Sequence, residues 1–358
     1  MKKRIDKLTS MLNEHQVDVA IISEKNNIRY YSGFTSEDAV LLIHRSACYC
    51  YLITDFRYIE QAHMQCRDFN VVDAPGIKTG PFIKETCMAL NAKRIWFDSD
   101  AISFRTYTSY KEALHPLELI PDRGIPSRLR LWKTEDEINH IRNAASLADK
   151  GFLHILGYIR PGVSEREIAL ELEFFLRRNG SDGLAFPIIV ASGKNGSLPH
   201  AEPTDKKIAE GELITLDFGC RISGYCSDMT RTVALGEPDK EMREIYEITL
   251  KSQQLALEVI GPGLTGIEVD NQAREYITAK GYGQYFGHGL GHGVGLNVHE
   301  APRLSINGEN VLEPGMVVSV EPGIYLPGRG GVRIEDLVVI TEDGYDNLVS
   351  SRKDLIVL

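Results

Sequence analysis

The chain has 358 residues, 43% of them hydrophobic and 25% charged, with a formal net charge of −10 and a pI near 5.6. The length predicts about two domains, and the composition is ordinary for a globular protein. The acidic balance argues against a nucleic-acid partner, because nucleic-acid-binding proteins usually carry a basic face.

The N-terminus and the cysteines point to a cytoplasmic protein without a membrane partner. The basic start, residues 1–7, is not followed by the apolar core of about 7–15 residues that a signal peptide needs. No apolar run approaches the roughly 18 residues of a membrane span. Six cysteines form no CxxC pair, and we expect reduced, partly buried thiols, although an oxidised Cys220–Cys226 pair is conceivable.

Residues 1–125 are predicted to form a small α/β domain. A helix at 3–15 precedes strands at 17–22, 39–43 and 48–53, and a further helix follows Thr54 and Asp55, either of which could cap it. Segment 121–127 holds two prolines and a glycine, which is typical of a linker. The second domain is therefore expected at 126–358.

The second domain is predicted to be α+β, with helices outside an antiparallel sheet. Capping-box patterns start two helices, at Thr134 and at Ser164, and the second should end near Asn179–Gly180. Two more helices are expected at 240–260 and 267–280. Between and after them lie strand pairs that carry acidic residues, and two such pairs hint at a duplicated core.

The first acidic pair is Asp217 and Asp228, on either side of a predicted turn. If the hairpin folds between Ile222 and Ser223, Asp217 lies directly opposite Asp228. Directly opposed residues have Cβ atoms about 4.5–5.5 Å apart, and two like charges at that distance destabilise the sheet. The arrangement therefore favours a bound cation.

The second acidic pair is Glu321 and Glu335. A turn centred on Gly328 places them opposite each other, whereas Asp336 should point to the other face because strand side chains alternate. Two such pairs predict two cations about 3.5–4 Å apart, as in two-metal hydrolases.

A glycine-rich segment at 287–299 adds histidines to these carboxylates. Its five alternating glycines, from 287 to 295, argue against a helix and let the backbone approach a ligand closely. One of His288, His292 and His299 should complete a metal site, and imidazole with carboxylates suits Mn, Co, Fe or Zn. The lack of thiolate ligands argues against structural zinc.

At this point the sequence resembles a known family, the M24 metallopeptidases. The ordered motifs that carry the likeness are LDFG (216–219), SDMTRT (227–232), GHGLGHGVG (287–295), VEPGIY (320–325) and RIED (333–336). Two weaker motifs, NIRYYSG (27–33) and TDFRY (54–58), resemble the creatinase-type N-terminal domain. The chain is most similar to Xaa-Pro dipeptidase (prolidase) and to aminopeptidase P.

The resemblance implies an α/β N-terminal creatinase-type domain plus an α+β "pita-bread" catalytic domain with two divalent ions. Mn²⁺ is expected, with Co²⁺ or Zn²⁺ as alternatives. Asp217 would bind one ion, His292 and Glu321 the other, and Asp228 and Glu335 would bridge. The substrate-side residues implied by the same motifs are His200, His288, His299, Arg303, Phe186 and Val298; for Phe186 and Val298 a plain core role stays open.

The implied reaction is hydrolysis of an Xaa-Pro bond in a small peptide. Two cations would lower the pKa of a shared water. Glu321 would move its proton to the leaving nitrogen, while His299 and His200 would hydrogen-bond the oxyanion or the proline carbonyl. Arg303 matches an arginine that meets the C-terminal carboxylate in prolidases, which favours dipeptides; a surface arginine, or a partner for a nearby acid, is the other interpretation.

Several alternatives stay beside this hypothesis. Aminopeptidase P, which takes longer peptides, is the nearest. Methionine aminopeptidases usually lack the N-terminal domain, and creatinase lacks the metal set. A non-catalytic pita-bread binding module is disfavoured because such relatives usually lose ligands, and all five are present here. The resemblance also suggests a homodimer.

Overall fold

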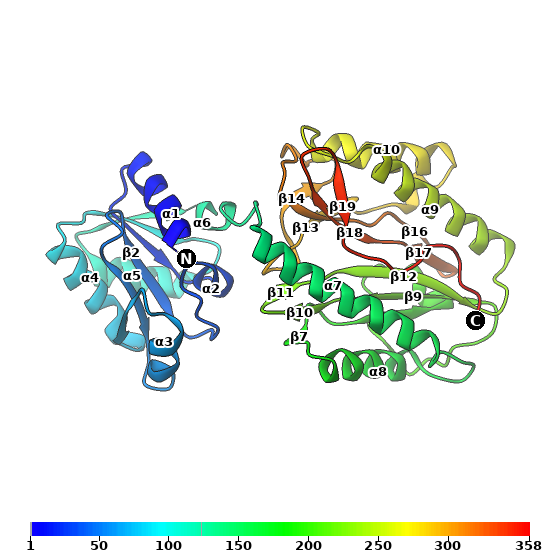
Figure 1. Cartoon of the computed structure of the whole chain (residues 1–358), viewed down its shortest axis with the longest axis horizontal. Coiled ribbons are helices and arrows are strands. Elements are labelled where there is room, and N and C mark those ends of the chain that lie inside the picture. The colour runs from blue at the N-terminus through cyan, green and yellow to red at the C-terminus, as the bar shows by residue number, and fades with distance from the viewer. Residues whose placement is uncertain (1, 123) are drawn as a thin grey trace. The chain divides into compact units, whose positions relative to one another are not determined.

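The chain forms two compact units, Met1–Arg130 and Leu131–Leu358, in a computed structural model that describes residues 2–122 and 124–358 (Figure 1). Each unit has its own hydrophobic core. The division lies a few residues beyond the predicted 125/126 boundary. No helix in the described part of the chain is long and apolar enough to cross a bilayer.

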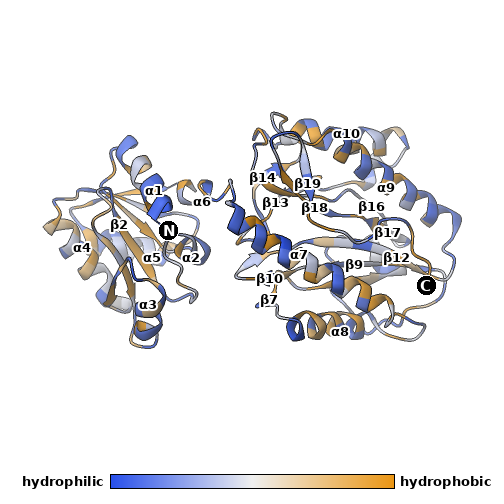
Figure 2. Cartoon of the chain, viewed as in Figure 1, coloured by the Kyte–Doolittle hydropathy of each residue, from blue (hydrophilic) through white to orange (hydrophobic). Residues whose placement is uncertain are grey.

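The first unit is a mixed six-stranded sheet with helices around it, as the α/β prediction requires. The strands follow the order β4-β3-β2-β1-β5-β6, antiparallel between β1, β2 and β3 and parallel elsewhere. They are largely apolar (Figure 2). Its strands are β1 Val19–Ile22, β2 Val40–His44, β3 Cys50–Thr54, β4 Asn70–Asp73, β5 Arg94–Asp98 and β6 Glu118–Asp122. Its helices are α1 Lys2–Glu14, α2 Lys25–Ser32, α3 Ile59–Gln65, α4 Thr79–Ala89, α5 Phe104–Leu114 and α6 Ile125–Arg128.

The predicted linker at 121–127 is wrong for the residues described there. Pro121 and Asp122 belong to the edge strand β6, where a residue without an N–H group is tolerated. The Asp122 carboxylate accepts a hydrogen bond from Ile125 N at 2.9 Å, which starts α6, and Tyr31 donates to Pro126 O at 2.9 Å. These contacts make the segment part of the first unit.

Helix α3 begins later than Thr54 and Asp55 predict. Its N-cap is Tyr58, with no side-chain capping bond. The Asp55 carboxylate instead pairs with Arg57, at 2.7 Å from Nη2, so it is not available to cap the helix.

The second unit is α+β and all of its strand pairs are antiparallel. Its helices are α7 Glu135–Leu156, α8 Glu165–Arg178, α9 Lys240–Val259 and α10 Gly266–Ala279. Its strands are β7 Gly183–Leu184, β8 Ile189–Ser192, β9 Glu212–Phe218, β10 Cys220–Ile222, β11 Tyr225–Cys226, β12 Met229–Leu235, β13 Gly291–Gly293, β14 Glu300–Leu304, β15 Val317–Val320, β16 Gly323–Leu326, β17 Gly330–Arg333, β18 Asp336–Ile340 and β19 Tyr345–Asn347. A helix pair followed by strands thus occurs twice, consistent with the suggested duplication.

The helices of this unit start where the capping boxes predict. Thr134 and Ser164 each accept a hydrogen bond from the N3 backbone N–H, and the N3 glutamate returns one, so two of the first free N–H groups are satisfied. In α7, apolar residues spaced three or four apart, such as Ile138, Ile141 and Ala145, are buried against the sheet. Figure 2 shows that hydrophobic and hydrophilic residues alternate along α7 and α10.

The strands of the second unit form four sheets that converge on one region. Their orders are β11-β10-β7, β12-β9-β8, β14-β13-β15-β18-β19 and the hairpin β16-β17. Helices α7 and α8 pack against the first two sheets, and α9 and α10 against β14 to β17 (Figure 1). The strand ends that carry the acidic residues are thereby enclosed between helices.

Candidate active site and metal centre

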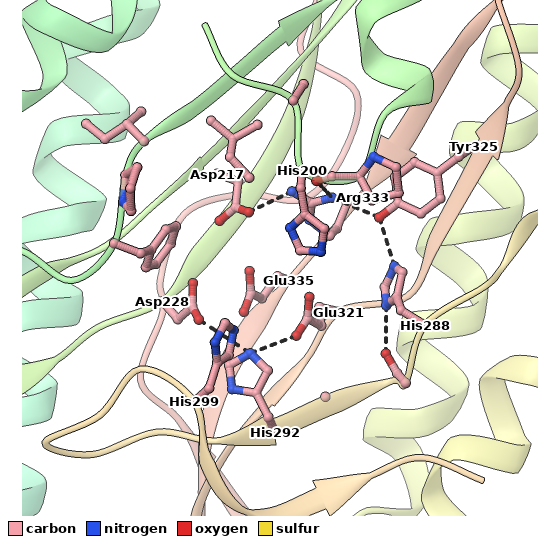
Figure 3. A pocket seen from close by; sticks show the side chains of 18 of the residues that line it. His200, Asp217, Asp228, His288, His292, His299, Glu321, Tyr325, Arg333 and Glu335 are labelled. Carbon is pink, nitrogen blue, oxygen red and sulfur yellow. Dashed lines mark hydrogen bonds and ion pairs between the residues drawn. The ribbon is translucent and has the colours of Figure 1, made fainter. Parts of the chain in front are cut away.

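A cavity of about 840 Å³ in the second unit collects nearly all of the residues that the sequence singled out. Figure 3 shows how their side chains point into it. Ten predicted site residues line the cavity: Phe186, His200, Asp217, Asp228, His288, His292, His299, Arg303, Glu321 and Glu335. Val298 does not line it; in that segment the lining residue is His299.

The predicted register of the first hairpin is wrong. Asp217 at the end of β9 pairs with Thr230 of β12, whereas Asp228 precedes β12. The turn is centred one residue later than predicted, at Ser223 and Gly224, which have φ of 51° and 78°. Two positive φ values are those of a type I′ turn, the connection that best matches the twist of a two-residue hairpin.

The two aspartates nevertheless share a face. Moving the turn by one residue changes the partner of Asp217 by two positions, and side chains two apart on a strand point the same way. Asp217 and Asp228 are therefore diagonal neighbours in the pairing scheme, at a greater separation than directly opposed residues. Both line the cavity, as predicted, despite the wrong register.

The register of the second hairpin is confirmed. Gly323 pairs with Arg333, and Gly328 in the turn has φ of 72°. Glu321 and Glu335 lie just beyond this ladder, at the point where each strand finds another partner. Glu321 N donates to Leu290 O, and Glu335 N donates to Thr230 O. The two glutamates thus stand at a junction of three sheets, with their side chains in the cavity (Figure 3).

His292 lies on the short strand β13, where glycines allow very close packing. A Cβ atom on Gly291 would come within 1.9 Å of Ser319 O, and one on Gly293 within 2.2 Å of Ala301 O. The ring Nδ1 is 3.2 Å from Gly293 O, which can only accept, so Nδ1 carries a proton. Nε2 therefore faces the carboxylates, 3.0 Å from Glu321 and 3.6 Å from Asp228.

The electrostatics divide the carboxylates into two kinds. Burial, and then the charges of neighbouring carboxylates, raise the pKa of Asp228 and of Glu335 well above the ordinary range. Burial also raises the pKa of Glu321, but the hydrogen bond and charge of His292 outweigh it and lower that pKa to about 2. Negative charge is therefore poorly compensated at Asp228 and Glu335.

These residues fit a metal ion. Ligand atoms of Asp228, His292 and Glu335 lie within 4.8 Å of one another, and all three residues are buried. Two buried carboxylate oxygens, Asp217 Oδ1 and Glu335 Oε1, have no hydrogen-bond partner. Buried polar atoms are rarely left unpaired, so a cation that accepts these oxygens as ligands accounts for them.

Sequence reasoning missed Arg333 and Tyr325. The Arg333 guanidinium is almost fully buried and donates to Asp217 Oδ2 at 2.6 Å and to Tyr325 OH at 2.8 Å. The Tyr325 hydroxyl in turn lies 2.8 Å from His288 Nε2 (Figure 3). Strand alternation could have identified Arg333 as a site residue, since residues 333 and 335 share a face.

The wall above the carboxylates is formed by histidines and an arginine. His288 Nδ1 lies 2.7 Å from Gly289 O, so this ring is oriented by the backbone. Burial lowers the pKa of His288, and burial with the nearby His292 lowers that of His299, which favours neutral rings. His200 and Arg303 are exposed and line the same cavity.

None of the six cysteines forms a disulfide bond with another described residue. Cys220 and Cys226 are both buried, and their thiols lie beside the carbonyls of Ala144 and Leu296. Cys48 is exposed and the other five cysteines are buried, so most of them are more deeply buried than the partly buried thiols expected from the sequence.

Comparison with known proteins supports the interpretation of this cavity as a metal-dependent active site. A sequence profile of metallopeptidase family M24 matches residues 139–342, and one of the creatinase/prolidase N-terminal domain matches residues 4–132. The Xaa-Pro dipeptidase of Pyrococcus furiosus is 37% identical over 99% of this chain and 100% of that protein.

Solved structures extend the likeness to the fold. An Xaa-Pro dipeptidase from Bacillus anthracis has a TM-score of 0.96 at 44% identity, covering 100% of this chain and 99% of that one. An X-Pro aminopeptidase from Thermotoga maritima has a TM-score of 0.88 at 37% identity, covering 96% and 98%. The predicted creatinase-type and pita-bread domains are thereby confirmed, and the chain belongs to metallopeptidase family M24.

Proposed function

We propose that this chain is a divalent-metal-dependent Xaa-Pro dipeptidase. The observation that carries the proposal is the meeting of the five ligand-type residues on one surface of a single cavity: Asp217, Asp228, His292, Glu321 and Glu335. The cavity also holds histidines and an arginine suited to a small peptide, and relatives that share the whole chain are Xaa-Pro dipeptidases.

Two divalent ions, Mn²⁺ in our proposal, would complete the site. Asp217 would hold one ion, His292 and Glu321 would hold the other, and Asp228 and Glu335 would be shared between them. The unpaired oxygens of Asp217 and Glu335 support this assignment. When bound, such ions activate water near neutral pH and polarise a carbonyl oxygen.

Glu321 is proposed as the proton carrier of the reaction. Its Oε1 receives a hydrogen bond from Ser319 Oγ at 3.0 Å and lies 3.0 Å from His292 Nε2, and these contacts fix its orientation. It would accept a proton from the attacking water and deliver it to the proline nitrogen that leaves. The proline nitrogen leaves as a secondary amine, so it must gain a proton as the C–N bond breaks.

The histidines of the wall bind the peptide in this proposal. His299 and His200 hydrogen-bond the oxyanion or the proline carbonyl, and the lowered pKa of His299 keeps its ring neutral for that role. His288 lies against Tyr325 and orients the same wall. Phe186 and the neighbouring Pro187 and Ile188 offer an apolar surface to the proline ring. Val298 stays a weaker candidate.

The role of Arg303 distinguishes an Xaa-Pro dipeptidase from an aminopeptidase P. It stands on the cavity wall, and no hydrogen bond or ion pair holds its guanidinium within the described residues. Such a group pairs well with the free carboxylate of a dipeptide. The likeness to an X-Pro aminopeptidase keeps aminopeptidase P as the second candidate.

The test is peptide hydrolysis by metal-stripped protein with and without Mn²⁺, on Ala-Pro and Met-Pro beside the matching Xaa-Pro-Yaa tripeptides. We expect Mn²⁺-dependent cleavage of the dipeptides alone. The Arg303→Ala variant should raise KM for Ala-Pro about 10- to 100-fold, since a hydrogen bond to a charged group contributes about 1.5–3 kcal/mol. Arg177→Ala, an exposed arginine paired within α8, is the control.

Three results would change the proposal. Equal or better cleavage of tripeptides would make the chain an aminopeptidase P. An unchanged KM for Arg303→Ala would remove the carboxylate anchor. No cleavage of either class by metal-loaded protein would contradict peptidase activity on Xaa-Pro bonds and favour a binding role.

The cellular setting is also a proposal. Six cysteines without a disulfide bond among the described residues suit a reducing compartment, and we infer the cytoplasm. A homodimer is proposed from the family resemblance, and sedimentation at the monomer mass would contradict it.

A further inference from the structure

One fully buried carboxylate of the second unit is not explained by the metal centre. Glu165 stands at the first position of α8, its exposed fraction is 0%, and it does not line the cavity. Burying a charge is costly unless it is well hydrogen-bonded. Its surroundings therefore indicate what the residue is for.

The carboxylate of Glu165 accepts hydrogen bonds from residues near both ends of one loop. Oε1 accepts from Ser192 N at 2.7 Å, Ser192 Oγ at 2.9 Å and Asn195 Nδ2 at 3.0 Å. Oε2 accepts from Thr204 Oγ1 at 2.6 Å and Thr204 N at 3.1 Å. The position at a helix N-terminus also favours a negative charge. A single side chain thus ties residue 192 to residue 204.

The loop closed in this way is the part of the chain that carries His200. Between the tied residues, the side chains of Pro199, His200, Ala201 and Pro203 line the cavity. The side chain of His200 itself makes no hydrogen bond with the residues that the structure describes. Its position must therefore come from the backbone of the loop.

The far side of the loop rests on the metal-site hairpin. Gly196 packs against Gly331 so closely that a Cβ on Gly331 would lie 2.1 Å from Gly196 O. Arg333 donates to Pro199 O at 3.2 Å, next to His200. With Glu165 at the base and Arg333 at the tip, the loop is held relative to the carboxylates.

We propose that Glu165 is a positioning residue for His200: its carboxylate closes the base of loop 193–203 and so places the His200 ring in the substrate cavity. This inference rests on the proposed Xaa-Pro dipeptidase function for its kinetic consequence only. The geometric consequence, an ordered loop, holds for any substrate.

The kinetic test is a double-mutant cycle with Glu165→Gln and His200→Ala on Ala-Pro, in the Mn²⁺-loaded full chain. Glu165→Gln keeps the volume but puts an NH₂ group where donors already point. We expect kcat/KM to fall on the order of 10- to 100-fold, the usual cost of a small misplacement, with metal content unchanged. In the His200→Ala background the same change should cost less than about threefold, because coupled residues are not additive.

The matched control is Glu137→Gln. Glu137 is, like Glu165, a buried glutamate in the first turn of a helix; it bonds to Thr134 and to Tyr225 OH at 2.7 Å, but none of these residues lines the cavity. It should lower stability while leaving kcat/KM within about threefold of the parent. If Glu165→Gln does not fold, Thr204→Val removes the shortest of the hydrogen bonds to the Glu165 carboxylate in its place.

Hydrogen exchange separates this inference from the proposed function. Amides of residues 196–203 should exchange faster in Glu165→Gln, or in Thr204→Val, than in the parent, with no such change in Glu137→Gln. Unchanged exchange in this loop, or an equal kinetic penalty with and without His200, would overturn the positioning role. Faster exchange in a protein that cleaves no Xaa-Pro peptide would retain the role and contradict the function.

Discussion

Glu335 and Asp336 are neighbours in the chain, and both are buried, with exposed fractions of 1% and 0%. Glu335 points to the cavity, receives one hydrogen bond from Thr230, and has an unpaired Oε1. Asp336 points to the other face, where Arg231 and Lys353 lie 2.8 and 2.6 Å from its oxygens. Strand alternation thus separates two carboxylates into opposite electrostatic environments.

The pKa shifts follow this difference. Burial raises both pKa values, but the charges of Glu321 and Asp217 raise that of Glu335 further, whereas Arg231 and Lys353 lower that of Asp336 overall. A buried carboxylate whose charge is balanced by the protein is part of the structure. One that the protein leaves unbalanced is prepared for an external cation.

The largest effect should come from exchanging these two residues for amides. Glu335→Gln should lose bound metal and, with it, several kcal/mol of transition-state stabilisation, roughly 1,000-fold in kcat/KM. Asp336→Asn should keep the metal but lose stability, because breaking a buried ion pair costs about 3–5 kcal/mol. Metal analysis and thermal unfolding of both variants measure the contrast.

Asp228→Asn extends the same comparison to the first hairpin. Asp228, like Glu335, has carboxylates as its main charged neighbours, so this variant should also lower metal content. An unchanged metal count in Asp228→Asn, or loss of metal in Asp336→Asn alone, would contradict the division into balanced and unbalanced carboxylates.

Glu321 extends the comparison between balanced and unbalanced carboxylates, because it lines the cavity and yet has His292 as a partner. His292 lies 3.0 Å away and lowers its pKa, so its ionised form is available as a base. We expect Glu321→Gln to reduce turnover about 10²- to 10³-fold, within the range for general acid–base groups, with metal content near two. Full activity with the metal retained would exclude Glu321 as the proton carrier.

The same alternation explains how much of the site the sequence could predict. Asp217 and Asp228 share a face under either register, because the error in the turn shifted the pairing by two positions. Asp336 could be excluded from the metal site because it is one residue from Glu335 and therefore points to the opposite face. The turn itself was misplaced because Ser223 with positive φ is not an obvious turn residue.

Contacts between distant segments lay beyond this reasoning. Arg333 and Asp217 are 116 residues apart and Glu165 and Thr204 are 39 apart, with no local pattern that links them. Their partners depend on how three sheets and two helix pairs meet in space. The predicted linker failed for a similar reason, since the prolines of residues 121–127 are accommodated by an edge strand and a short helix.

A smaller effect is expected from the one hydrogen bond that Glu335 does receive. Arg333 Nε donates to Thr230 Oγ1 at 3.2 Å, so the hydroxyl proton points to Glu335 Oε2 at 2.7 Å. Thr230→Val should weaken Mn²⁺ affinity about 10- to 100-fold, the usual cost of losing a group that orients a ligand. Thr215→Val, a buried threonine bonded to Thr232 in the same strand pair, is the control. Equal affinities in a metal titration would contradict this orienting role.

The smallest effect should appear in the pH dependence of stability. In the metal-free protein the raised pKa values of Asp228 and Glu335 mean that the folded state binds protons that the unfolded state has released. The free energy of unfolding therefore falls as the pH rises above about 4, the ordinary carboxyl value, through these raised pKa values. Bound metal replaces those protons, so this loss should disappear in the loaded protein.

Other groups also titrate in this pH range, but they do so in both the Mn²⁺-loaded and the metal-free protein. His288 and His299, with lowered pKa values, add stability as the pH rises through about 6.5, the opposite sign. The informative quantity is therefore the difference in Tm between Mn²⁺-loaded and metal-free protein from pH 5 to 8, which should widen with pH. Mn²⁺ binding should also release protons, measured by calorimetry in two buffers. A constant Tm difference without proton release would mean that Asp228 and Glu335 are ionised before the metal arrives, and the contrast with Asp336 would lose its electrostatic basis.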